Sequence, residues 1–320
     1  MKEGERGRKL ERLLPRMKSR AAIPAVLALG LISAGCVVHV DTQAQIVREE
    51  KRFRVSGVPD LQLVTFDGSI EIRAWDKPDI LVEVEKRGAT KEAVEALQIV
   101  ATQDGGRIEL EVKRPRSESF SGIGFHRSAS ANLIVSVPRR VDVRARTGDG
   151  SIRVERISGR LELRTGDGSI SASEISGEAL LNTGDGSITV AGAQGALDID
   201  TGDGGVNVSG RIDRLKVRTG DGSVVFRGEP DVRMAGNWEI STGDGSVTLF
   251  LPPNFDAVVD AHTGDGSVRS ELDVAGDDQL ERDSNGKGKE SRRSLKGRLG
   301  AGGNNLRIRS GDGTIRLRAS

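Results

Sequence analysis

The sequence is poor in aromatic residues and in cysteine. Its 320 residues include seven Phe, two Trp and no Tyr, and Cys36 is the only cysteine. A chain with so few large aromatic side chains is poorly suited to a large globular core. Its 42 glycines instead favour short stacked strands joined by tight turns.

The chain also lacks an excess of charge of either sign. It carries 48 Lys and Arg against 47 Asp and Glu, and residues 1–20 hold eight of the basic residues and three of the acidic ones. The remaining residues therefore carry a small net negative charge. A nucleic-acid-binding protein would show a basic domain or stripe, so we expect no nucleic-acid partner.

The main apolar run is too short to span a bilayer. Ala21–Gly35 has 15 residues, whereas a transmembrane helix needs about 20. A basic segment precedes this run and small residues end it, as in a secretory signal. We therefore predict an exported protein with a signal peptide over residues 1–35, and Met17 is an alternative start.

The residues around Cys36 predict a lipid anchor. Ile32-Ser33-Ala34-Gly35-Cys36 resembles the lipobox of bacterial lipoproteins, with Ser33 where Leu is usual. The resemblance implies cleavage before Cys36 and acylation of its thiol, so that residues 36–47 tether the chain to a membrane. The alternatives are an ordinary secretory signal with an incidental cysteine, or a buried cysteine. Val37 rather than Asp follows Cys36, which favours the outer membrane if the cell has two membranes.

A six-residue motif recurs at a fixed spacing. Thr147-Gly148-Asp149-Gly150-Ser151-Ile152 returns every 18 residues, with copies that begin at Thr165, Thr183, Thr201 and Thr219. Alternating apolar and polar residues beside each copy predict two short strands per unit. One unit cannot bury its apolar side alone, so units must stack. We therefore predict an all-β fold with a parallel β-solenoid over residues 141–273, its rungs about 4.8 Å apart.

The flanking segments are expected to differ from the repeats. Residues 48–140 predict a β-rich cap with one short helix after Thr90, a residue suited to cap it. Residues 274–303 lack apolar periodicity and predict a flexible basic loop, which either stays solvated or touches anionic headgroups. Residues 304–320 are expected to close the solenoid with a last pair of strands.

The glycines of the motif are expected to form tight turns with positive φ. They are Gly148, Gly150, Gly166, Gly168, Gly184, Gly186, Gly202, Gly204, Gly220 and Gly222. The aspartates between them are expected to accept hydrogen bonds from nearby backbone N–H groups. In a stack of rungs the aspartates also form one column, and Ca²⁺, which takes six to eight oxygen ligands, is an alternative explanation for them. The column consists of Asp149, Asp167, Asp185, Asp203 and Asp221.

The repeated turns resemble those of the DUF4097 family of β-strand-repeat proteins. The resemblance includes the opening Leu61–Ile72 and the close Gly302–Ile315, and it covers about residues 50–320. It implies an exported or envelope-associated bacterial β-solenoid with an adhesin-like role. Some members of the family are tied to envelope-stress signalling. The family supplies no catalytic residues.

Catalysis is the rival to a binding role, since parallel β-helices also include polysaccharide lyases and hydrolases. Such sites need converging carboxylates in a groove, and clefts for sugars favour aromatic platforms. Only Trp75 and Trp238 are candidates for such a platform. The three histidines have no metal-ligand spacing, and they are His39, His126 and His262.

We therefore expect a non-catalytic lipoprotein of the cell envelope that binds or scaffolds a protein or glycan and needs no cofactor. One alternative is a calcium-dependent binding module that uses the aspartate column. A second alternative is a regulator of envelope stress. A carbohydrate-active enzyme is the remaining alternative and the least favoured.

Overall fold

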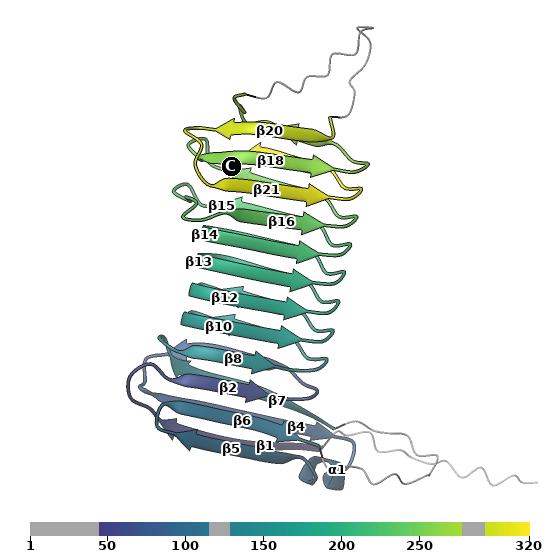
Figure 1. The fold of residues 1–320 in the computed structure, drawn as a ribbon. Coiled ribbons are helices and arrows are strands. Elements are labelled where there is room, and N and C mark those ends of the chain that lie inside the picture. Colours follow the sequence, from purple (N-terminus) through teal and green to yellow (C-terminus); the bar gives the residue numbers. More distant parts are fainter. Residues whose placement is uncertain (1–44, 115–128, 277–291) are drawn as a thin grey trace, which may run out of the picture. The chain divides into compact units, whose positions relative to one another are not determined.

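The computed structural model describes residues 45–114, 129–276 and 292–320. Residues 42–320 form one compact unit, whose described part contains 22 strands and one short helix (Figure 1). The predicted all-β fold is thereby confirmed. The signal segment, Cys36, His39 and His126 lie outside the described residues. No helix within the described ranges is long and apolar enough to cross a membrane.

The elements are numbered in chain order. The N-terminal region contains β1 (Gln45–Arg54), β2 (Asp60–Val64), β3 (Ile70–Trp75), β4 (Asp79–Gly88), α1 (Lys91–Glu95), β5 (Gln98–Asp104), β6 (Arg107–Lys113) and β7 (Ser130–Pro138). The middle contains β8 (Asp142–Arg146), β9 (Ile152–Glu155), β10 (Ser158–Thr165), β11 (Ile170–Ser173), β12 (Ser176–Thr183), β13 (Ile188–Thr201) and β14 (Val206–Thr219). The C-terminal part contains β15 (Val224–Gly228), β16 (Trp238–Thr242), β17 (Val247–Leu251), β18 (Ala257–Thr263), β19 (Val268–Ser270), β20 (Ser294–Leu299), β21 (Asn305–Ser310) and β22 (Ile315–Ala319).

The repeat strands form because apolar and polar residues alternate along them. In β10, Leu161, Leu163 and Thr165 are buried, whereas Arg160 and Arg164 are exposed. A shift of the pairing by one residue would bring the arginines inside and the leucines outside. The alternation therefore fixes which side of each strand faces the core.

Neighbouring coils pair in parallel and place like residues on top of one another. Ile170 pairs with Ile152 on one side and with Ile188 on the other, so that each partner lies 18 residues away. Leu163 pairs with Leu181 in the same way. The repeat in the sequence is therefore a repeat in space.

The paired strands build two faces with the core between them (Figure 1). Face A is the ladder β5, β6, β2, β8, β10, β12, β13, β14, β16, β21, β18 and β20. Face B is the ladder β1, β4, β7, β3, β9, β11, β13, β14, β15, β17, β22 and β19. The long strands β13 and β14 give their first residues to face B and their last to face A. Inside, the rings of Phe226 and Trp238 meet edge to face with centroids 4.8 Å apart.

The last strands do not close the stack as expected. β21 lies between β16 and β18, and β22 lies between β17 and β19. Leu306 pairs with Trp238 on one side and with Val259 on the other, and it is fully buried. Because both neighbours of residues 304–320 are apolar coils, this segment buries more surface inside the stack than it would at an end.

The basic segment before them is partly a strand and not wholly a loop. β20 pairs antiparallel with β18. Leu295 and Leu299 are buried, while Lys296 and Arg298 point outward. Gly297 takes the inward position between these two leucines, so the apolar pattern in the sequence is too short to predict a strand. The part of the predicted loop at residues 277–291 lies outside the described residues.

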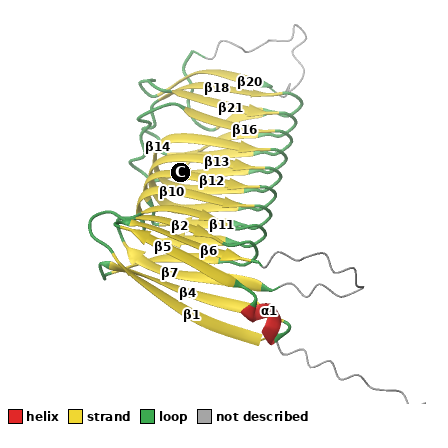
Figure 2. Cartoon of the chain, turned by 60° about the horizontal axis from the view of Figure 1, so that its bottom comes forward, coloured by secondary structure: helices red, strands yellow, loops and turns green. Residues whose placement is uncertain are grey.

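The N-terminal end replaces parallel pairing by antiparallel pairing. β4 pairs antiparallel with β1 and with β7, and β5 pairs antiparallel with β6 (Figure 2). The predicted tether ends earlier than expected, since β1 already begins at Gln45. Thr90 caps α1, with its Oγ1 accepting a hydrogen bond from the Ala93 N–H at 3.2 Å. The coil of β2 and β3 lies between the later strands β6 and β7 and the first repeat.

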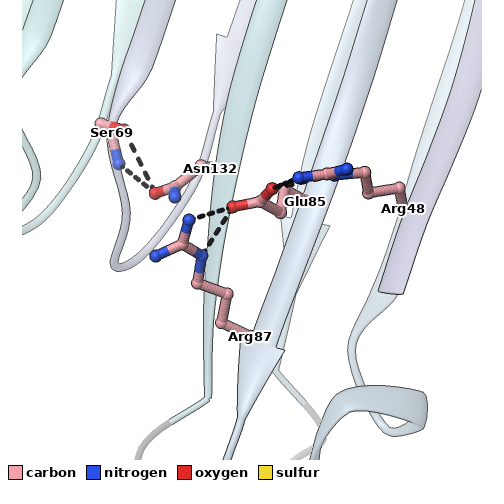
Figure 3. A network of polar contacts seen from close by, with 5 residues as sticks. All are labelled: Arg48, Ser69, Glu85, Arg87 and Asn132. Atoms are coloured by element: carbon pink, nitrogen blue, oxygen red, sulfur yellow. Dashed lines mark hydrogen bonds and ion pairs between the residues drawn. The ribbon is translucent and has the colours of Figure 1, made fainter. Parts of the chain in front are cut away.

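A buried carboxylate joins the antiparallel strands at this end. Glu85 on β4 accepts hydrogen bonds from Arg48 on β1 at 2.8 Å and from Arg87 at 2.6 Å (Figure 3). The hydrogen bond from Arg48, followed by that from Arg87, holds the pKa of the Glu85 carboxyl below its usual value. A second contact in Figure 3 joins β7 to the turn before β3, because Asn132 Oδ1 accepts from the Ser69 N–H at 2.9 Å.

Candidate binding face and groove

The motif glycines have a different role from the one predicted. None of the ten has a φ in the left-handed region, so the expectation of positive φ was wrong. The Gly166 N–H donates to the Gly148 carbonyl at 2.5 Å, and the Gly184 N–H donates to the Gly166 carbonyl at 2.5 Å. A Cβ atom on Gly168 would lie 2.1 Å from the Gly150 carbonyl oxygen. The glycines are required because successive turns approach each other closely.

The threonine that opens each motif links one coil to the previous one. Thr165 Oγ1 donates to the Gly150 carbonyl at 2.7 Å, and Thr183 Oγ1 donates to the Gly168 carbonyl at 2.8 Å. Both threonines are buried, and their hydroxyls satisfy carbonyl groups at the turn. Sequence analysis missed this role, although Thr begins every regular copy of the motif and Ser310 takes its place in the last one.

The aspartates of the motif point outward. Asp149, Asp167, Asp185, Asp203 and Asp221 are all exposed. In the described part of the chain, their carboxylates form no hydrogen bond or ion pair, so the predicted carboxylate-to-backbone bonds are not made there. Among the same residues no group of three or more His, Cys, Asp or Glu is placed to hold a metal ion. Calcium binding by this column stays a prediction.

The two tryptophans do not form an exposed sugar platform. Trp238 is fully buried between Phe226 and Phe255. Trp75 is half-buried, donates from Nε1 to the Asp79 carbonyl at 2.8 Å, and has Lys77 Nζ 4.8 Å from its ring centroid. Both rings therefore pack against other residues of the chain. His262 on β18 is exposed.

A groove of about 510 Å³ opens on face A across β10, β12, β13 and β14. One short outward side chain opens it, because Ala196 stands in a column that otherwise carries Arg160, Glu178 and Arg214. In the next outward column, Leu180 stands between Glu162 and Asp198. Leu180 and Ala196 are the half-buried apolar side chains of the groove floor. The other apolar residues beneath it have buried side chains that face the core, and they are Leu161, Ala179, Leu197 and Leu215.

Charged pairs of both signs form the rim of this groove. Arg160 Nη2 lies 2.7 Å from Glu178 Oε2, and Lys216 Nζ lies 3.2 Å from Asp198 Oδ2. The hydrogen bond from Arg160 lowers the pKa of the Glu178 carboxyl. These pairs are exposed and therefore contribute little to stability. They are free to exchange partners with a bound molecule.

One arginine of the rim has no carboxylate of its own. Arg214 forms no ion pair or side-chain hydrogen bond with another described residue, although its charge also lowers the pKa of the Glu178 carboxyl. Gly236 leaves room for its aliphatic part, because a Cβ atom there would lie 2.6 Å from Arg214 Cγ. The groove thus combines an apolar floor with a charged rim in which Arg214 is not held in an ion pair.

The sequence contains a signal for this groove. In the aligned outward columns of the repeats, Leu180 and Ala196 are apolar where the neighbouring copies carry charged residues. This departure becomes meaningful only when the register shows that the two residues lie on adjacent strands.

Residues 59–318 match the family profile described as Toastrack DUF4097. The chain belongs to this family. The resemblance read from the turn motifs is thereby confirmed, and the stacked fold agrees with it. No curated protein matches the chain.

Several solved structures are similar to this Toastrack protein. An adhesin candidate from Bacteroides fragilis is 12% identical, with 85% of this chain and 97% of the other covered and a TM-score of 0.43. A lipid-binding candidate from Parabacteroides distasonis is 14% identical. The match covers 84% of this chain and 96% of the other, with a TM-score of 0.41. A cell-adhesion candidate from Clostridium sporogenes is 15% identical. The match covers 86% of this chain and 100% of the other, with a TM-score of 0.29. At these values the likenesses carry no argument about what this chain binds.

Proposed function

We propose that this Toastrack protein is a non-catalytic, adhesin-like binding element, held at the cell envelope by a lipid on Cys36, and that its partner lies in the groove on face A. The groove is the observation that carries the proposal. It interrupts a regular surface with an apolar floor and a rim of exchangeable charges. Small hollows lined by apolar residues with a few polar groups are the usual form of a binding site.

The pKa shifts of the carboxyl groups in the described residues favour a binding role over glycoside hydrolysis. Three carboxyls have a shifted pKa, and in each case an arginine lowers it by a hydrogen bond. Arg48 acts on Glu85, Arg160 on Glu178, and Arg309 on Asp260. A general acid in glycoside cleavage needs a raised pKa, which is the opposite shift.

The lining favours a polypeptide segment over a glycan. No aromatic residue lines the groove, whereas sugars commonly stack on aromatic rings. Leucine and alanine on the floor suit an apolar side chain, and Arg214 suits a carboxylate beside it. The partner proposed is therefore an extended segment of another envelope protein, with one apolar and one acidic residue close together.

The binding role is tested by site-specific photo-crosslinking on living cells. A photoreactive residue at Leu180, on the groove floor, should form a discrete adduct with another protein. The matched probe at Thr189, which is exposed on face B, should not. Equal adducts at both positions, or none at Leu180, would count against the groove.

The lipid anchor is tested separately. Cells fed an alkyne-tagged fatty acid should label the wild-type chain and retain it in the membrane fraction. Cys36→Ser should abolish the label and release the protein or block its processing. Equal labelling of both chains would disprove acylation at Cys36.

A further inference from the structure

Four strands form the outer edges of the two faces. β5 and β20 end face A, and β1 and β19 end face B, because within the described residues each pairs with one strand only. An edge strand offers unpaired N–H and C=O groups to any other strand. Natural proteins usually protect such edges with charged side chains.

Three of these edges carry charge within the strand, whereas β5 has its single charge at its last residue, beside the turn. β1 contains six charged residues, β20 contains Lys296 and Arg298, and β19 contains Arg269. β5 reads Gln98-Ile99-Val100-Ala101-Thr102-Gln103 before its last residue, Asp104. Six consecutive uncharged residues without proline leave this edge unprotected.

The backbone N–H and C=O groups of alternate residues in β5 point away from β6, toward the unpaired edge of the strand. Asp104 pairs with Arg107 across a two-residue turn, and in such a hairpin alternate residues bond the partner strand. Ile99, Ala101 and Gln103 then direct their backbone groups toward the free edge. In the described part of the chain, no element other than β6 runs alongside β5.

One exposed apolar side chain lies on this edge. Among the described residues, the large hydrophobic side chains that remain exposed are Ile46, Val47, Val58, Val100 and Ile134. Ile46, Val47 and Ile134 belong to β1 and β7 on face B, whereas Val100 lies on β5 itself and is 40% exposed. An unprotected edge strand that carries an exposed apolar side chain is suited to pairing with another strand.

We propose that β5 pairs antiparallel with β5 of a second copy of this chain, about a two-fold axis at Ala101. In this register Val100 faces Thr102 of the second copy, Ile99 faces Gln103, and Gln98 faces Asp104. No like charges oppose each other, and an isologous contact of this kind closes as a dimer. The edge of β20 is less suited to this contact, because the backbone of Arg298 already pairs with Ala275. The same operation there would also set Lys296 against Arg298 of the second copy, which is repulsive.

A charge-reversal pair tests the register. Residues 42–320 form a compact unit with its own core, so this chain is suitable for sedimentation equilibrium. Val100→Lys with Thr102→Lys places lysine against lysine twice across the axis and should weaken the dimer at least about tenfold. Val100→Lys with Thr102→Glu places lysine against glutamate and should restore it. Both double variants alter the same two outward positions, so they control for folding and for the loss of Val100.

Each result of these sedimentation experiments either supports or overturns the proposed dimer. A wild-type dimer that the lysine pair disrupts and the lysine–glutamate pair retains supports the proposal. A wild-type chain that stays monomeric at all concentrations overturns it. A dimer that both double variants leave intact, or that both disrupt equally, also overturns it, because neither result depends on the β5 register. The groove lies on other strands, so its crosslinks do not depend on this result.

Discussion

At the scale of single residues, the turns are held by hydroxyl and glycine contacts between coils. Thr183 is buried and donates to the Gly168 carbonyl at 2.8 Å. Thr183→Val keeps the shape of the side chain but leaves that carbonyl without its donor, which should lower the free energy of unfolding by about 1–3 kcal/mol. Urea unfolding measures the change. Thr183→Ser should recover most of it, and Thr189→Val on the exposed face should have little effect.

The glycines give a second prediction at this scale. A Cβ atom on Gly168 would lie 2.1 Å from a backbone oxygen, whereas one on Gly205 has its nearest neighbour at 3.7 Å. Gly168→Ala must therefore push two coils apart and should destabilise the protein by about 3 kcal/mol. Thermal unfolding measures both variants, and Gly205→Ala should change stability by much less. Equal losses would mean that backbone freedom, and not close approach, explains the motif.

At the scale of elements, the pairing of β1 with β4 depends on the charge of Glu85. Its pKa is held below the usual value by Arg48 and Arg87. A carboxyl whose pKa is lower in the folded than in the unfolded protein stabilises the fold at every pH above its unfolded-state pKa. This stabilisation is lost as the pH falls through the pKa of the carboxyl in the folded protein. Glu85→Gln should therefore be less stable than wild type at neutral pH, and the difference should shrink in acid. A difference that persists unchanged below the folded pKa would contradict this role.

The strands also show which parts of the fold can be predicted from the sequence and which cannot. The period of Ile152, Ile170 and Ile188 predicts parallel stacking because equal spacing in the chain becomes equal position in the coil. The period cannot place Leu306 inside the stack, since an apolar strand suits several coils equally well. Likewise Leu180 and Ala196 become a groove floor only when the register brings them together. Local patterns thus specify the strands, while the order of the end strands and the site follow from long-range packing.

At the scale of the whole molecule, the stack is predicted to be stable without calcium. The turns are joined by Thr hydroxyls and Gly backbone bonds, and the aspartates between them are exposed. A ligand at a hundred times its dissociation constant adds about 2.7 kcal/mol per site. Thermal unfolding of residues 42–320 in millimolar calcium and in chelator should therefore coincide. A melt raised by many degrees in calcium would identify the aspartate column as a metal site.

The central claim is that the groove on face A holds the partner, and filling the groove tests it most directly. Ala196→Arg restores the long side chain that the rest of the column carries, and it should fill the hollow without disturbing the core. The yield of the Leu180 crosslink is the measurement, with Thr189→Arg on face B as the matched control. The account predicts that Ala196→Arg abolishes the adduct and that Thr189→Arg leaves it unchanged. An adduct that survives Ala196→Arg at full yield would contradict the account.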